Sequence, residues 1–207
     1  MRSIHTVFVV AYFAAMALEV VLRLPYSRLH RRTEKKDRRI DIRERIVLAA
    51  LSLGTLLLPL IYALTPWLDF ADYRLPQTSA IVLGVLGLPL LAAAVWVFWR
   101  AHRDLGAGWS PSLEIAEGQR LITTGIYGSV RHPMYASLLL WSLAQPLLLQ
   151  NWVAGPPGLA VLLLALLVRV PGEERMMLDH FGDEYRAYSL RTGRVLPRIN
   201  VFRGERG

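Results

Sequence analysis

The sequence predicts an all-α integral membrane protein with five transmembrane helical segments, the last two forming a tight hairpin, and a C-terminal cytoplasmic helical cap. Two observations lead to this fold class: 54% of the 207 residues are hydrophobic, and they gather into long blocks. A helix needs roughly 20 apolar residues to cross the hydrocarbon core of a bilayer. Three blocks reach that length, at residues 4–24, 46–68 and 75–99.

The first block is expected to be a retained helix rather than a cleaved signal peptide. Glu19 and Arg23 stand where a small-residue cleavage site would be needed. Pro25 is expected to end this helix, because its ring lacks the N–H that the helix would use.

Two shorter apolar blocks follow at residues 134–149 and 152–168. Only Gln150 and Asn151 separate them, which predicts the helical hairpin. Their length leaves open whether they cross the bilayer fully or dip into it. The chain is therefore expected to be one membrane domain, 1–207. It comprises three transmembrane helices (1–99), a cytoplasmic connecting loop (100–134), the hairpin (135–170) and a cytoplasmic tail (171–207).

Basic residues lie in three segments, with nine between Pro25 and Arg45, four in 100–131 and seven from Gly172 onward. The positive-inside rule then places the N-terminus outside and the C-terminus in the cytoplasm. The net charge of +8 is attributed to this topology and to contact of the basic loop with anionic lipids. Nucleic acid is not expected as a partner, because no aromatic residues are interleaved with the basic ones.

The basic loop itself, over 31–44, fits either a short amphipathic helix or a disordered segment. The chain has no cysteine, which removes disulfides and thiolate chemistry. Arginine supplies nearly all of the basic residues, and together with the absence of cysteine this favours a bacterial source. The expected location is then the bacterial cytoplasmic membrane.

The polar segment 125–135 leads into the hairpin and is the first candidate functional motif. Pro133 suits the first turn of a helix, so Arg131 and His132 would lie at the mouth of that helix. Charged and imidazole groups at that depth are either interfacial anchors or ligand-binding groups. The residues alone leave both roles open.

A second polar cluster follows the hairpin, from Glu173 and Glu174 to Tyr185, Tyr188, Arg191 and Arg194. Pro171 before two acids is typical of the first turn of a new helix, where negative charge complements the helix dipole. Helix capping is therefore an alternative role for the two glutamates, and interface anchoring is an alternative for the tyrosines. Phe181 and Gly182 are expected to end this helix.

Taken together, the two clusters resemble a known family. The pattern Gly-x-Tyr-x-x-x-Arg-His-Pro-x-Tyr, a helical hairpin, Glu-Glu, Phe-Gly-x-x-Tyr, Tyr-x-x-Arg and Leu-Pro is similar to the isoprenylcysteine carboxyl methyltransferases and their phospholipid N-methyltransferase relatives. The resemblance covers residues 125–197. Ile126 and Ser137 depart from it, where many members have proline and glycine, and both departures bear on substrate choice rather than on chemistry.

The resemblance implies S-adenosylmethionine as cofactor and S-adenosylhomocysteine as product. It implies that the cofactor is bound by Tyr127, Arg131, His132, Pro133, Tyr135, Glu173, Glu174, Tyr185 and Tyr188. These residue types can hold an adenine, ribose hydroxyls, an amino acid moiety and a sulfonium. The same resemblance makes Arg191 the first candidate to orient an acceptor carboxylate, with Arg194 second and Glu174 as a further catalytic residue. No metal is expected, because His132 has no second histidine at ligand spacing.

The function implied first is carboxyl O-methylation of an isoprenylated cysteine, or of a similar lipophilic acceptor that enters from the membrane. Methylation of a phospholipid amine or a small thiol is one alternative, with His132, Tyr135 or Glu174 as base. The others are an NADPH-dependent membrane reductase and a non-enzymatic membrane anchoring bundle. A Rossmann-type methyltransferase is excluded, since the sequence has no βαβ alternation.

Overall fold

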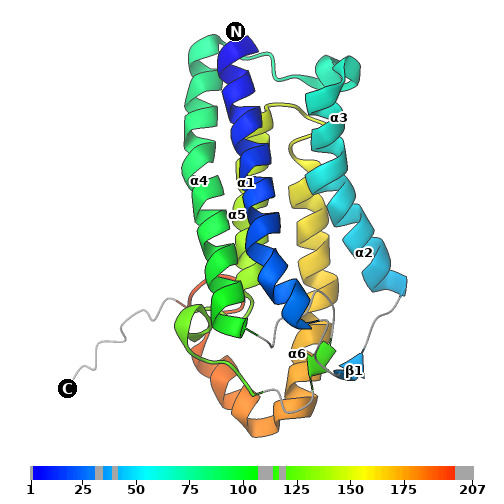
Figure 1. The fold of residues 1–207 in the computed structure, drawn as a ribbon, viewed down its shortest axis with the longest axis vertical. Coiled ribbons are helices and arrows are strands. Elements are labelled where there is room, and N and C mark those ends of the chain that lie inside the picture. The colour runs from blue at the N-terminus through cyan, green and yellow to red at the C-terminus, as the bar shows by residue number, and fades with distance from the viewer. Residues whose placement is uncertain (1, 31–34, 39–41, 107–113, 117–119, 199–207) are drawn as a thin grey trace, which may run out of the picture.

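A computed structural model describes residues 2–30, 35–38, 42–106, 114–116 and 120–198. Long helices lie side by side along one axis and form an elongated bundle (Figure 1). Three stretches are long and apolar enough to cross a membrane, Ile4–Ser27, Arg45–Leu64 and Gln77–Leu105. The predicted all-α class and the integral membrane character are thereby confirmed.

The first helix, α1, runs from Arg2 to His30 and continues through Pro25. The prediction that Pro25 ends this helix is wrong. A proline inside a helix removes one backbone hydrogen bond and bends the axis, and a long apolar helix packed against its neighbours can tolerate that.

The second apolar block forms one continuous rod with an irregular centre. It consists of α2 (Ile42–Ser52), the π-helical turn η1 (Leu53–Leu57) and α3 (Leu58–Leu64). Thr65 is extended, and the short 3₁₀ helix η2 (Pro66–Ala71) follows. The helix thus ends before Pro66, as the sequence allows.

The π-turn and Pro59 free two backbone carbonyls in the middle of the bundle. The N–H of Leu58 bonds to the oxygen of Leu53, so it does not bond to Gly54. Pro59 has no N–H to donate to Thr55. Both carbonyls find side-chain donors: Gln145 Nε2 lies 2.8 Å from the Gly54 oxygen, and the Tyr12 hydroxyl lies 2.6 Å from the Thr55 oxygen.

Gln145 and Tyr12 also contact each other and form the mid-bundle network, which comprises Tyr12, Trp141 and Gln145. The Tyr12 hydroxyl lies 3.1 Å from Gln145 Oε1, and Trp141 Nε1 donates to the Tyr12 oxygen at 3.1 Å. Gln145 Nε2 donates further to the Ala154 oxygen at 2.6 Å. All three side chains are buried. The network joins α1, the π-turn and α5 through uncharged groups whose hydrogen bonds are satisfied.

The remaining helices complete the bundle. Helix α4 (Gln77–Leu105) packs most extensively on α5 (Pro133–Leu149), and α6 (Pro157–Arg191) returns beside α2 and α5. Gly54 lets α6 approach the rod closely, since a Cβ added there would lie 3.1 Å from the Gly158 Cα. The main core cluster contains Phe8, Tyr12, Leu91, Ala94, Trp141, Ala144, Leu148, Leu149 and Ala154.

Helix α6 differs from the prediction for the tail. It runs 35 residues and passes through Pro171, so a new helix does not begin there. Helical geometry is broken instead at Gly182 (φ 53°, ψ −125°), which agrees with the predicted end near this glycine. The last membrane-side turns and the Glu173–Glu174 pair therefore lie on one continuous helix.

A two-stranded antiparallel ribbon, β1 (Lys35–Arg38) with β2 (Glu114–Ala116), was not predicted. The alternative of an amphipathic helix over 31–44 is wrong for residues 35–38, while residues 31–34 and 39–41 lie outside the described part of the chain. The ribbon joins the basic loop to the loop after α4.

Apolar side chains are exposed along the outer faces of the helices. Val7, Val10 and Val21 on α1 and Val82, Val85 and Leu86 on α4 are each at least half exposed. Such continuous apolar surface is costly in water and favourable in lipid.

Candidate functional site

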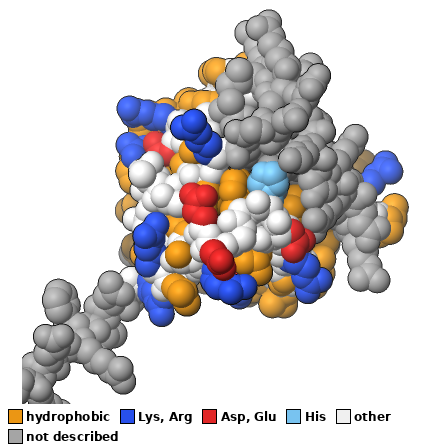
Figure 2. Space-filling model, turned by 90° about the horizontal axis from the view of Figure 1, so that it is seen from below, with side chains coloured by type: hydrophobic (Ala, Val, Ile, Leu, Met, Phe, Trp, Pro, Cys, Tyr) orange, Lys and Arg blue, Asp and Glu red, His pale blue; other side chains and the backbone are white. Residues whose placement is uncertain are grey.

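The two predicted clusters meet at one end of the bundle, the lower end in Figure 1, where α4 ends and α5 begins. Backbone hydrogen bonds join them: the N–H of Arg131 donates to Gly193 at 2.8 Å, and the N–H of His132 donates to Arg194 at 2.9 Å. The segment before α5 and the segment after α6 are therefore fixed side by side. Seen from this end, acidic side chains lie among basic ones (Figure 2).

The 3₁₀ turn η4 (Gly125–Gly128) prepares the approach to α5. Gly125 adopts φ 61°, which favours glycine. The next N–H, of Ile126, donates to Asp104 Oδ2 at 2.8 Å, and Arg100 pairs with the same oxygen at 3.2 Å. The motif is thus anchored to the last turns of α4.

Glu174 is the centre of the charged contacts. Its Oε1 accepts from Arg131 Nη2 at 2.8 Å and from Arg131 Nε at 3.1 Å, and its Oε2 lies 2.8 Å from Arg194 Nη2. Arg131 also donates to the Ser189 oxygen at 2.8 Å and to the Thr192 oxygen. One arginine therefore joins α6, the segment after it and the loop before α5.

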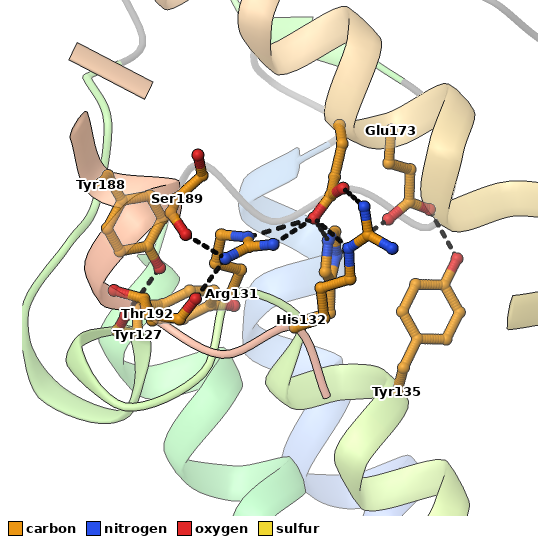
Figure 3. Close-up of polar contacts among 10 residues, drawn as sticks. Tyr127, Arg131, His132, Tyr135, Glu173, Tyr188, Ser189 and Thr192 are labelled. Atoms are coloured by element: carbon orange, nitrogen blue, oxygen red, sulfur yellow. Dashed lines mark hydrogen bonds and ion pairs between the residues drawn. The ribbon is translucent and has the colours of Figure 1, made fainter. Parts of the chain in front are cut away.

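Glu173 forms a second set of contacts, and the one with Tyr135 is drawn in Figure 3. The Tyr135 hydroxyl donates to its Oε1 at 2.6 Å, Arg169 Nη2 lies 3.4 Å from that oxygen, and His132 Nδ1 lies 3.4 Å from Oε2. His132 stands between the two glutamates, because its Nε2 lies 3.5 Å from Glu174 Oε1. We call Arg131, His132, Tyr135, Glu173, Glu174 and Arg194 the charged cluster.

The other tyrosines lie beside the charged cluster. The Tyr188 hydroxyl donates to the backbone carbonyl oxygen of Tyr127 at 2.6 Å, and the ring centroids of Tyr185 and Tyr188 are 6.0 Å apart. Tyr127, Tyr185 and Tyr188 are buried. We call these three tyrosines the aromatic wall.

Protonation follows from these contacts. Burial opposes the charged form of Glu174, but the nearby His132, the hydrogen bonds from Arg131 and the charge of Arg194 lower the pKa of its carboxyl to about 2. Burial also opposes the charged form of Glu173, but His132, Tyr135 and Arg169 outweigh it and lower the pKa of this carboxyl. Burial alone would lower the pKa of His132, but the two glutamates outweigh it and raise that pKa. The cluster therefore holds two carboxylates around an imidazolium.

His132 Nε2 and the Tyr185 hydroxyl are buried polar atoms of the site with no hydrogen-bond partner among the described residues. Burial raises the pKa of Tyr185, and the charge of Arg131 opposes that rise. The Tyr185 hydroxyl and the Arg131 guanidinium do not form a hydrogen bond of normal geometry. Orphaned donors beside carboxylates, an arginine and aromatic rings suit a polar ligand with an aromatic part. The residues present thus fit the predicted cofactor.

Most predicted site residues are brought together, with one exception. Arg191 is exposed at the end of α6, and no hydrogen bond or ion pair of its side chain is found in the described part of the chain. Burial raises the pKa of Tyr188 to about 12, and the charges of Arg131 and Arg191 oppose that rise. Pro133 begins α5 as predicted and is fully buried.

Arg169 is a site residue that the sequence reasoning missed. Its side chain is 8% exposed and pairs with Glu173, four residues further along α6. The available signal was an arginine at the end of an apolar run, since ionisable groups near membrane depth are rarely incidental. Beside it, Tyr135 and Val170 pack with Leu162 in an apolar cluster. The side of the site nearest the bundle is therefore apolar.

Across the described residues, no group of three or more His, Asp or Glu side chains is arranged to hold a metal ion. Fold and site together define a helical integral membrane protein with a charged, aromatic-lined site at one end of the bundle.

Comparison with known proteins agrees with this class. Residues 85–179 match the model of the isoprenylcysteine carboxyl methyltransferase family. This segment includes α5 and both glutamates.

Three curated relatives are each named protein-S-isoprenylcysteine O-methyltransferase. The Schizosaccharomyces pombe protein is 32% identical over 127 residues, 59% of this chain and 50% of its own. The human protein is 28% identical over 142 residues, 66% and 50% of the two chains. An Arabidopsis thaliana protein, form B, is 31% identical over 84 residues, 41% and 43%. The chain thus spans about half the length of these relatives or less.

Proposed function

We propose that this protein is an S-adenosylmethionine-dependent membrane methyltransferase that methylates the carboxylate of an isoprenylated cysteine or of a similar lipophilic acceptor. The observation that carries the proposal is the charged cluster, with its orphaned His132 Nε2 and the adjoining Tyr185 hydroxyl. The match to the family model and the names of the relatives support the same reaction.

The cofactor would be held by the charged cluster and the aromatic wall. The carboxylates of Glu173 and Glu174 can accept from hydroxyl or ammonium groups, and Arg131 and His132 can hold a carboxylate. Tyr127, Tyr185 and Tyr188 offer ring faces for an adenine or a sulfonium. When bound, S-adenosylmethionine supplies a methyl group on a positively charged sulfur.

The acceptor would be oriented by an arginine. A carboxylate is ionised at neutral pH and needs no general base, so the protein must position it and exclude water. Arg169 suits this role better than Arg191, because it is buried beside Tyr135 at the apolar side of the site. Arg194 pairs with Glu174 but is itself exposed, which suits closing the cofactor side.

The membrane arrangement proposed for this activity has five segments, with α5 and the first part of α6 as the last two. The N-terminus would lie outside and the charged cluster at the cytoplasmic face of a bacterial membrane, with anionic lipids at the basic loop. An acceptor with a lipid tail could then reach the cluster laterally, past the apolar packing around Leu162.

Cofactor binding is tested by calorimetric titration of detergent-purified protein with S-adenosylhomocysteine. Glu174→Gln should weaken binding at least about tenfold, since it removes the charge that Arg131 and Arg194 pair with. Glu184→Gln makes the same change at an exposed position of α6 and should leave binding intact. Binding of NADP instead of S-adenosylhomocysteine would replace the proposal by a reductase.

The acceptor class is tested by methyl transfer to a farnesylated cysteine with a free carboxylate, assayed as base-labile methyl ester. A phospholipid amine and a small thiol serve as competing acceptors, and transfer to either alone would contradict carboxyl methylation. Arg169→Lys should raise the KM for the acceptor about tenfold, because lysine lacks the planar fork of arginine. Arg191→Lys is the matched control, and an equal rise there would remove Arg169 from the orienting role.

A further inference from the structure

A cavity of about 240 Å³ lies at the end of the bundle opposite the charged cluster. Five segments supply its lining: α1, α3, the connection after η2, the start of α4 and the residue after α5. The lining residues are Ile4, His5, Phe8, Tyr62, Asp72, Tyr73, Leu75, Gln77, Ala80, Ile81 and Gln150. Its size is below the roughly 300–1,000 Å³ of sites for drug-sized ligands, so it suits a small chemical group.

Hydrogen bonds hold the walls of this cavity in place. The N–H of Tyr73 donates to the Gln150 oxygen at 2.8 Å, and Gln150 Nε2 donates to the Ala80 oxygen at 2.7 Å. Gln150 itself is left-handed (φ 51°), a conformation that non-glycine residues rarely adopt. This conformation ends α5, and the contacts of Gln150 with Tyr73 and Ala80 fix its place beside the cavity.

Aromatic rings form much of the lining. Phe8, Tyr62 and Tyr73 contribute rings, and Tyr73 is fixed by Trp152, whose ring centroid lies 4.6 Å away. His5 packs edge-on against Tyr62, and its Nε2 lies 3.0 Å from the Leu149 oxygen. Because a carbonyl only accepts, this Nε2 carries a hydrogen. The ring faces offer negative potential without a formal charge.

The formal charge of the lining is negative. Asp72 is its acidic residue, and the lining contains no lysine or arginine. Asp72 accepts from the neutral amide of Asn151 at 2.9 Å, and no ion pair of Asp72 with a basic residue is found in the described ranges. A carboxylate beside aromatic rings is the chemistry that recognises organic ammonium groups.

The cavity also lies at a level where lipid headgroups are available. Trp67, Phe70 and Trp152, at the same end of the bundle, are 72%, 76% and 66% exposed. Exposed aromatic residues at the ends of membrane helices mark the interface between hydrocarbon and headgroups.

We propose that this cavity binds a short alkylammonium group, of the kind carried by ethanolamine or choline, either in a phospholipid headgroup or as a free amine. Asp72 neutralises the ammonium, and Phe8, Tyr62 and Tyr73 surround it. The site is separate from the charged cluster, and it does not depend on methyl transfer.

The test is calorimetric titration of the protein, purified in an amine-free maltoside detergent, with short-chain phosphatidylethanolamine, phosphatidylcholine and phosphatidylglycerol. The two ammonium lipids should bind saturably and phosphatidylglycerol should not. Free ethanolamine and choline form the second arm. Binding of the lipids and the free amines alike shows that the ammonium group suffices, while binding of the lipids alone identifies the headgroup as the source.

Asp72→Asn should weaken binding of the ammonium ligands at least about tenfold. Asp69→Asn changes an exposed acid on the preceding helical turn, outside the lining, and should have no effect. Ala80→Leu fills the cavity and leaves every polar group in place, so it should also abolish binding. It provides the test if Asp72→Asn proves unstable. Melting temperature and S-adenosylhomocysteine binding verify the fold of each variant. Equal binding of phosphatidylglycerol, equal effects of the two Asp→Asn changes or no saturable ammonium binding would each overturn the proposal.

Discussion

The mid-bundle network and the charged cluster are both buried polar systems that join several helices, but they are built from different groups. Tyr12, Trp141 and Gln145 are uncharged, and their donors are matched to carbonyls that the π-turn and Pro59 leave free. The charged cluster contains two carboxylates, two arginines and an imidazolium, and leaves His132 Nε2 without a hydrogen bond.

The difference shows that buried polar groups can serve either stability or ligand binding. A neutral network with every bond made stabilises one arrangement of helices and has nothing left to offer a ligand. A cluster of charges with orphaned atoms is costly to bury and is completed by an added partner. The predictions below break one system at a time and ask whether stability and ligand binding change together.

The largest loss of stability is expected from Arg131→Met. This change leaves Glu174 partly unpaired and removes the donor to the Ser189 and Thr192 oxygens, so it should cost about 3–5 kcal/mol. It should also abolish S-adenosylhomocysteine binding. Unfolding is followed by circular dichroism in detergent. Arg186→Met, at an exposed pair with Asp183, should change stability by less than about 0.5 kcal/mol.

A smaller loss is expected from Gln145→Leu, which leaves the Gly54 and Ala154 oxygens without their donor. The cost should be about 1–3 kcal/mol, as for other unsatisfied buried groups. Affinity for S-adenosylhomocysteine should remain unchanged by calorimetry, because the network does not reach the charged cluster. If this variant lost affinity as Arg131→Met does, the separation of the two systems would be wrong.

Gly182→Ala should cost about 1–2 kcal/mol through backbone strain alone, since φ is 53° and a Cβ there meets no atom within 4 Å. Gly172→Ala is the matched control on the same helix, also with open space but with ordinary helical geometry. It should stabilise α6 by about 0.4–1 kcal/mol. Thermal unfolding of both variants gives the comparison, and equal effects would contradict the strain.

The most gradual effect is on the pH dependence of stability. His132 has a pKa raised above its unfolded value of about 6.5, so its contribution is fully present below that pH and is lost as pH rises through the folded pKa. Stability measured from pH 6 upward should therefore fall more steeply in the wild type than in His132→Asn. Gln145→Leu should keep the wild-type slope, because the mid-bundle network does not titrate in this range.

The sequence was sufficient to predict most of the residues that meet in the candidate site. Arg131, His132, Tyr135, Glu173 and Glu174 were singled out by the family resemblance, and the hairpin predicted between the two clusters implied that they meet. Arg169 was missed because it appeared to be the end of an apolar run. Its pairing with Glu173, at four residues' distance on one helix, is visible only when α6 is known to be continuous.

The continuity of α6 was not predictable from local signals. Pro171 and Gly172 favour a helix start, but contacts of Glu173 with Arg169 and Tyr135 span that point, and tertiary contacts override local propensity. The ribbon of β1 and β2 pairs segments far apart in the chain, and Lys-Lys-Asp-Arg carries no strand pattern. The prediction that Pro25 ends α1 failed for the same reason, since packing against the neighbouring helices keeps the helix continuous through this proline.

Because α6 runs without a break through Pro171, this helix would fix the distance between the acceptor and the cofactor. Four residues of helix fix the rise from Arg169 to Glu173 at about 6 Å, so the separation of an acceptor carboxylate from the cofactor would be set by backbone geometry rather than by loop closure. Changes in the apolar turns below Arg169 could then alter which lipid tails are accepted without altering the methyl-transfer distance. Acceptor range and catalytic alignment would be separately adjustable along a single helix.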